Sequence, residues 1–149
     1  MKLAHNIIIS VFAKDDEDYD KISSGLFRLI PFDILKEKII VEEIKAKGLE
    51  CPEIKIMEAK LIKDRHVNGF LKNLNNALPE EQKKKLMDQY LSRLDEDLNF
   101  YIRLDKGELL EGKHKLTDKG DCFHIKIHLA CYPEKTEIAK GLLKQIFKY

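Results

Sequence analysis

Side chains that can bind phosphate or stack on bases occur at alternate positions in the last third of the chain. Tyr101 and Arg103 alternate with apolar residues, and so do His124, Lys126 and His128. Such alternation is typical of a β-strand with one buried and one exposed face. Lysine and arginine neutralise phosphates, whereas tyrosine and histidine stack on unpaired bases or hydrogen-bond to a ribose hydroxyl. The pattern therefore predicts an exposed sheet face with groups suited to RNA.

Two further lysines, Lys113 and Lys115, lie between these runs. We expect residues 109–116 to form a third strand of the same sheet, followed by a turn at 118–121, which would add both lysines to the exposed face. Gly112 can mark a bulge that changes which way their side chains point. The alternative explanation for the whole face is that its polar residues only keep a half-exposed sheet soluble.

Other kinds of chemistry have little support in the sequence. His124 and His128 would be about 13 Å apart on one strand, too far to share a metal ion. The adjacent acids at 95–97 point in different directions, which favours a solvated turn over a metal or acid–base site. The motifs of serine hydrolases, phosphate-binding loops, dinucleotide-binding folds and zinc proteases are absent from the sequence. We therefore predict a non-catalytic protein with no metal and no cofactor; a small hydrolase built on 95–97 is the least favoured alternative.

Composition indicates one domain spanning residues 1–149 and no membrane partner. The chain has 149 residues with 27 basic and 26 acidic side chains, and no apolar run approaches the ~20 residues of a membrane span. A net charge of +1 excludes proteins that coat nucleic acid non-specifically, so any contact with nucleic acid must be local. Cys51, Cys122 and Cys131 form no metal or disulfide pattern, which favours a reducing cytoplasm.

The hydrophobic periodicity predicts the elements that position these strands. Residues 39–47 and 54–62 should pair as a hairpin through 48–52, with a bulge near Met57 where the apolar phase shifts. Few strands are separated by single helices, so we predict an α+β two-layer sandwich, a mainly antiparallel sheet with helices packed on one face. The expected strands are 5–13, 39–47, 54–62, 98–105 and 122–131, and the expected helices are 18–30, 64–78, one beginning at Pro79, and 133–149.

Three segments carry a resemblance to a known family. Residues 93–106 (RLDEDLNFYIRLDK), 121–128 (DCFHIKIH) and 130–135 (ACYPEK) resemble the archaeal RNA-binding or predicted exosome-subunit family. The resemblance implies an RNA-associated, non-catalytic protein with an antiparallel sheet backed by helices, similar in architecture to some ribosomal proteins. The segment 48–52 differs from the glycine- and histidine-containing hairpin of the family, so we assign no RNA contact there.

Two functions follow from these observations. In the first, the protein binds RNA through the exposed sheet face and is accessory to RNA processing, exosome or ribosome-related complexes. In the second, it is an adaptor or self-associating module, such as a homodimer, that docks on exosome or ribosomal proteins through a sheet edge or through Ile8 and Phe12, without touching RNA. The first hypothesis assigns phosphates to Arg103, Lys113, Lys115 and Lys126, and bases or ribose to Tyr101, His124 and His128.

Overall fold

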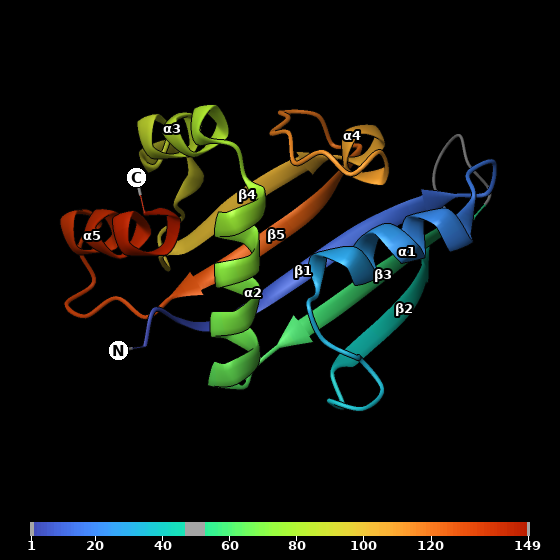
Figure 1. Ribbon diagram of the computed structural model, residues 1–149, viewed down its shortest axis with the longest axis horizontal. Coiled ribbons are helices and arrows are strands. Elements are labelled where there is room, and N and C mark those ends of the chain that lie inside the picture. The colour runs from blue at the N-terminus through green and yellow to red at the C-terminus, as the bar shows by residue number, and fades with distance from the viewer. Residues whose placement is uncertain (1, 47–52, 149) are drawn as a thin grey trace.

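The computed structural model describes residues 2–46 and 53–148. Within these ranges five strands form one sheet, and helices α1 and α2 lie across a single face of it (Figure 1). The predicted connection at 48–52, with Cys51, lies outside the described residues. The elements in chain order are β1 (Ala4–Lys14), α1 (Tyr19–Leu29), β2 (Ile40–Ala46), β3 (Ile54–Leu61), α2 (Asp64–Ala77), α3 (Glu80–Asp88), the 3-10 turn η1 (Leu91–Arg93), β4 (Asn99–Asp105), α4 (Lys106–Leu110), β5 (Cys122–Leu129) and α5 (Thr136–Phe147).

The sheet has the strand order β2-β3-β1-β5-β4, and all neighbouring strands are antiparallel. In the centre, Ile9 of β1 lies opposite Ala59 of β3 and Ile125 of β5, and all three are fully buried. Alternate residues of a strand point to opposite faces, so this row marks the face that packs against the helices. The predicted α+β fold, a mainly antiparallel sheet with helices on one face, is confirmed.

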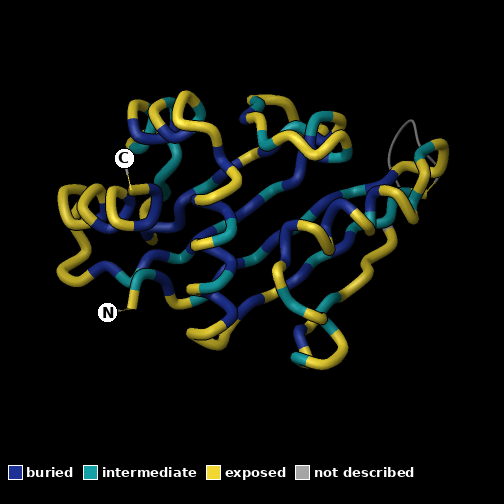
Figure 2. The backbone as a smooth tube through the Cα atoms, viewed as in Figure 1, coloured by how far each residue is buried: buried dark blue, intermediate teal, exposed yellow. Residues whose placement is uncertain are grey.

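Large aromatic side chains fill the space between the sheet and the helices. Phe70 of α2, Phe100 of β4, Phe123 of β5 and Phe147 of α5 are fully buried, and the rings of Phe100 and Phe147 have centroids 6.2 Å apart. Figure 2 shows the buried segments running through the sheet and the exposed ones on the outer surfaces of the helices. Each buried side chain of this size contributes about 1.5–3 kcal/mol, so the core fixes the sheet as a rigid platform.

The predicted bulge near Met57 is wrong. The register of β3 is continuous with β1 on one side and with β2 on the other. Met57, Ala59 and Leu61 are buried against the helices, whereas Ile54 and Ile56 are only partly buried on the opposite face. The apolar phase changes because the face turned away from the helices is apolar at the start of β3, where Lys55 holds the helix-side position, and the helix-side face is apolar only from Met57 onward. The strand itself is regular.

The predicted strand at 109–116 is also wrong: its first two residues are the end of helix α4, and a turn and irregular chain follow. The side chain of Asp105 accepts a hydrogen bond from the backbone N–H of Glu108 at 2.9 Å and so caps this helix. Gly112 follows the helix with a φ of +85°, a conformation that favours glycine. Leu116 makes an isolated bridge with Leu104 at the edge of β4. None of the described helices is long and apolar enough to cross a membrane.

Candidate nucleic-acid interface

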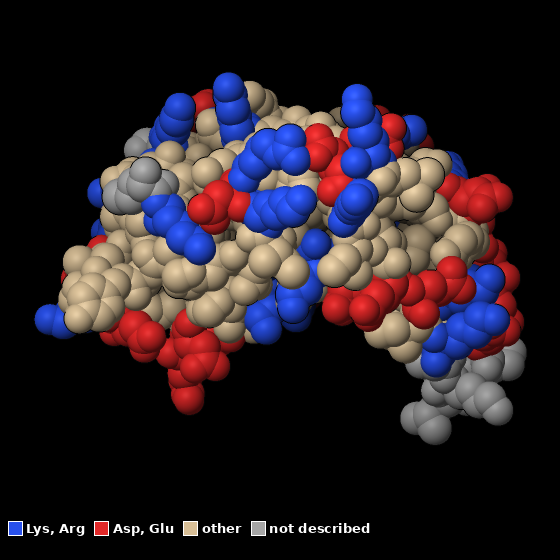
Figure 3. Space-filling view, turned by 90° about the horizontal axis from the view of Figure 1, so that it is seen from below, with Lys and Arg blue, Asp and Glu red and all other residues tan. Residues whose placement is uncertain are grey.

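The face of the sheet turned away from α1 and α2 carries a second, more polar set of side chains. No helix in the described ranges lies over it (Figure 1). Seen from below, the molecule is hollowed on this side, with basic side chains in the middle of the hollow and acidic ones on both of its arms (Figure 3). We call this surface the open face. Its shape and exposure leave it accessible to a large ligand.

The five candidate residues on β4 and β5 share the open face. Tyr101 lies opposite Lys126, Arg103 lies opposite His124, and His128 is the next outward residue along β5. The rings of Tyr101 and His124 have centroids 5.4 Å apart. The expectation that these side chains come together on one face is confirmed; that they contact RNA stays a prediction.

The aromatic ring of Tyr101 is held in place by the turn before β4. Its hydroxyl donates a 2.7 Å hydrogen bond to Asp95 Oδ2, and Asp95 also accepts bonds from the backbone N–H groups of Asp97 and Asn99. Burial acts to raise the pKa of Asp95, but these hydrogen bonds lower it to about 2. The Asp95 carboxylate in turn raises the pKa of Tyr101 to about 12. The carboxylate at Asp95 therefore serves to build the turn and orient Tyr101.

His124 lies beside a pocket of about 270 Å³ on the open face, which Ser10, Phe12 and Arg103 also line. Burial lowers the pKa of His124, and the positive charges of Arg103 and Lys126 lower it further. The imidazole is therefore neutral at neutral pH, where it can stack on a base and can both donate and accept hydrogen bonds.

A basic residue that sequence reasoning missed extends this surface across the sheet. Lys60 of β3 is exposed and lies opposite Ile8, which on its other side lies opposite Lys126. The two lysines thus flank the central strand in one row. The alternation of Lys60 with the buried Ala59 and Leu61 is the signal that would have found it.

The structure does not bring Lys113 and Lys115 next to Lys126. Because 109–116 is not a strand, no register aligns these two lysines with β5. They line a recess beside α3, where the backbone N–H of Leu116 donates to Gln82 Oε1 at 2.8 Å. Lys115 lies at the outer edge of β4, and its carbonyl accepts a bond from the N–H of Asp105 at 2.8 Å. Contact of RNA with either lysine stays a prediction.

The part of the open face formed by β2, β3 and β1 is different in character. Phe12, Ile56 and Ile44 form one apolar row across the three strands. In the row beside it, Glu42 lies opposite Glu58. Acidic side chains repel a polyanion, so this half of the open face is suited to a protein surface and the half on β4 and β5 to a phosphate backbone.

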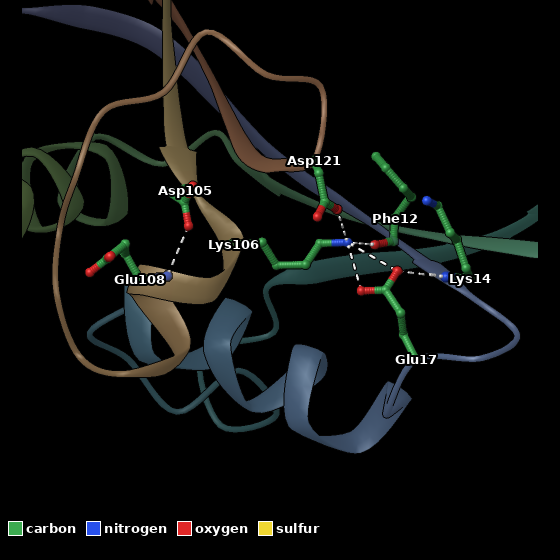
Figure 4. A network of polar contacts seen from close by, with 7 residues as sticks. All are labelled: Phe12, Lys14, Glu17, Asp105, Lys106, Glu108 and Asp121. Atoms are coloured by element: carbon green, nitrogen blue, oxygen red, sulfur yellow. Dashed lines mark hydrogen bonds and ion pairs between the residues drawn. The ribbon is translucent and has the colours of Figure 1, made fainter.

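A buried lysine fixes the loops that border the open face. Lys106 is 3% exposed, and its Nζ donates to the carbonyl of Phe12 at 2.8 Å while forming ion pairs with Asp121 at 2.7 Å and Glu17 at 3.2 Å (Figure 4). The same Nζ lies 4.2 Å from the centroid of the Phe12 ring. One cation therefore ties together β1, the segment before α1, and the loop that leads into β5.

The model of a family described as RNA binding matches residues 6–129. The chain belongs to this RNA-binding family.

Relatives and solved structures agree with this assignment. RNA-binding protein PAB1135 from Pyrococcus abyssi is 32% identical over 134 residues, which cover 90% of this chain and 87% of the relative. The crystal structure of protein AF2318 from Archaeglobus fulgidus is similar with a TM-score of 0.83 and 26% identity, covering 96% of this chain and 99% of that one. The structure of Mth689, a DUF54 protein from Methanothermobacter thermautotrophicus, has a TM-score of 0.78 and 28% identity, covering 97% and 98%. The predicted archaeal RNA-binding family is confirmed; the exosome link in that prediction stays a prediction.

In this member of the RNA-binding family, the matched residues include the whole of the basic half of the open face and leave out α5. They also include Arg93, which sequence reasoning did not single out as a binding residue because it lies in the irregular segment η1, where no periodicity indicates its direction. Among the described residues, no group of three or more His, Cys, Asp or Glu side chains is arranged to hold a metal ion.

Proposed function

We propose that the protein acts as a single domain that binds RNA without catalysis, through the β4 and β5 half of its open face. Arg103 and Lys126 contact phosphates, and Tyr101, His124 and His128 contact bases or ribose. The observation that carries this proposal is the placement of these five side chains in adjacent register positions on a hollowed sheet face. A sheet face with aromatic and basic residues is how several RNA-binding modules hold unpaired bases.

The distribution of charge restricts where the RNA lies. The net charge of the chain is only +1, so its attraction for a polyanion comes from local positive groups. Arg103 and Lys126 supply these on β4 and β5, whereas Glu42 and Glu58 oppose RNA at the far side. We therefore expect RNA to make few phosphate contacts and to bind with modest, salt-sensitive affinity.

Stacking supplies the second part of the interaction. The ring of Tyr101 is oriented by Asp95, and His124 beside it is neutral at neutral pH. Rings that are already ordered lose little conformational entropy when a base stacks on them, and each stacked base contributes about 1–3 kcal/mol.

The apolar half of the open face supports an accessory role in a complex. The row of Phe12, Ile56 and Ile44 lies beside the proposed RNA surface, and Ile44 is 45% exposed. We propose that a protein of an exosome or ribosome-related complex covers this row while RNA occupies β4 and β5. This row also favours the second candidate function, an adaptor or self-associating module that makes no contact with RNA.

The test is the affinity of the protein for short single-stranded and hairpin RNAs at two salt concentrations. We expect binding that weakens as salt rises, and loss of binding in the double variant Arg103→Glu, Lys126→Glu with the fold intact by circular dichroism. The matched control is Lys21→Glu, Arg28→Glu, which makes the same charge change on the exposed surface of α1.

Failure of the unchanged protein to bind any RNA at low salt contradicts the proposal and leaves the adaptor function. Equal loss of binding in the two double variants contradicts the assignment of the site, because it shows that only net charge matters.

A further inference from the structure

A second pocket lies at the outer edge of β4, next to the proposed RNA surface. It has a volume of about 400 Å³ and is lined by Arg93, Tyr101, Arg103 and Asp118, together with residues from the end of α3 and η1. Arg103 also lines the pocket beside His124. The two pockets are therefore joined by one arginine, and a strand that lies over His124 can continue past Arg103 to Arg93.

The guanidinium of Arg93 is fixed in direction by the protein. Its Nε and one terminal nitrogen donate to Gln89 Oε1 at 3.2 and 2.7 Å, and its other terminal nitrogen donates to the carbonyl of Tyr101 at 3.3 Å. Arg103 donates one bond, to the carbonyl of Asp118 at 3.3 Å. An arginine has five N–H groups. Two on Arg93 and four on Arg103 are thus without a hydrogen-bond partner in the described part of the chain.

The two guanidinium groups form an arrangement that favours an anion. Arg93 is half-buried, and burial lowers its pKa; the neighbouring charge of Arg103 lowers the pKa further, while Asp118 acts in the opposite direction. Two cations that face one pocket repel each other, and a bound anion removes that repulsion. With one carboxylate from Asp118, the pocket keeps a net positive charge.

We propose that the pocket between Arg93 and Arg103 binds a phosphate group of the RNA. Arginine suits phosphate because its planar set of N–H donors matches the spacing of phosphate oxygens. Asp118 opposes the phosphate and limits its affinity. This inference rests on the proposed function, and it adds that the RNA strand leaves the open face across the edge of β4. The phosphate is either one within the strand or the phosphate at its 5′ end.

The first test compares RNA affinities of single variants. We expect Arg93→Gln to weaken binding about tenfold, the effect of losing hydrogen bonds to a charged group, and to reduce the salt slope by about one. Arg28→Gln is the matched control: Arg28 is an exposed arginine on α1 that also donates to a carbonyl, that of Leu110. This control should bind RNA like the unchanged protein.

The second test is a substitution that should tighten RNA binding, and its result is valid even if Arg93→Gln damages the fold. Asp118 is exposed, and Arg103 contacts its backbone carbonyl, which Asp118→Asn keeps. Removing the carboxylate should tighten RNA binding several-fold, a gain that damage to the fold cannot produce.

The two sources of phosphate are distinguished with RNAs that carry a 5′-phosphate or a 5′-hydroxyl. If Arg93→Gln weakens binding of both equally, the pocket holds a phosphate within the strand. If Arg93→Gln abolishes a preference for the 5′-phosphorylated RNA, the pocket holds the terminal phosphate. Wild-type affinity in both Arg93→Gln and Asp118→Asn overturns the inference and leaves RNA binding on the open face intact. Absence of RNA binding by the unchanged protein overturns the proposed function, and this inference with it.

Discussion

The phenol of Tyr101 donates a 2.7 Å hydrogen bond to Asp95, six residues earlier in the chain. This bond joins the turn at 95–98 to the first outward-facing ring of β4. The turn also places Leu98 in a left-handed conformation, with a φ of +60°, while Asp95 accepts the N–H groups of Asp97 and Asn99. Asp95 is therefore the residue through which the acidic turn orients an RNA-facing side chain.

Loss of the Asp95 carboxylate should lower stability in a pH-dependent way. The folded state holds the pKa of Asp95 at about 2, below its ordinary value of 3.8, so its contribution is complete above about pH 4 and is lost as the pH falls toward 2. We expect Asp95→Asn to unfold more easily by about 1 kcal/mol at neutral pH, and the difference to shrink below pH 4. Urea unfolding at pH 7 and near pH 2.5 measures this. A difference that is the same at both pH values contradicts it.

Replacing Lys106 with methionine should destabilise the protein, although methionine keeps the approximate length and the apolar character of the lysine side-chain stem. Lys106→Met leaves Glu17 and Asp121 without their shared cation and the Phe12 carbonyl without its donor. Because Asp121 is more than half exposed, part of the cost is screened, and we expect a loss of roughly 2 kcal/mol. Thermal and urea unfolding measure this loss of stability. The control is Lys119→Met, a change of an exposed lysine in the loop that carries Asp121. Equal stability of the two variants contradicts a structural role for this network.

Sequence patterns predicted the regular elements well and the irregular ones poorly. The alternation on β4 and β5 predicted which side chains point outward because the apolar residues of both strands recur with a period of two. The same reasoning failed at 109–116, where the cap at Asp105 and the left-handed Gly112 decide the structure and neither changes the hydrophobic pattern.

The part of the candidate site that lies on regular strands was predictable from the sequence, and the part that lies on irregular segments was not. Arg93 becomes a site residue only through its bonds to Gln89 and to the carbonyl of Tyr101, which arise from tertiary structure. The ties of Lys106 to Glu17 and Asp121 span long stretches of sequence, and nothing in the local pattern reveals them.

His124 should make stability depend on pH near neutrality. Its pKa is below the ordinary value of 6.5 in the folded state, so the unfolded chain binds its proton more readily. Stability is then greatest above about pH 6.5 and falls as the pH decreases below that value. His5 and His114 also have lowered pKa values and act in the same direction. We expect His124→Gln to reduce the loss of stability between pH 7 and pH 5, measured by urea unfolding; an unchanged pH dependence argues against a neutral His124.

Lys113 and Lys115 should contribute to binding only when the RNA is long enough to reach them. They lie beyond the outer edge of β4, next to α3, whereas Lys126 lies on β5. The double variant Lys113→Gln, Lys115→Gln should therefore bind an RNA that covers only the open face with unchanged affinity. For a longer RNA, we expect weaker binding and a salt slope reduced by up to about two, one for each lost phosphate contact.

Lys126→Gln serves as the comparison for this last prediction, because it should weaken the binding of both RNAs and reduce the salt slope by about one. The measurement is the affinity of each variant for a short and a long RNA at two salt concentrations, which also gives the salt slope. If the double variant weakens short and long RNAs alike, the RNA crosses the β4 edge at Lys115 and not at Arg93. Unchanged binding of the long RNA shows instead that the strand turns away at Arg93, and then neither lysine belongs to the interface.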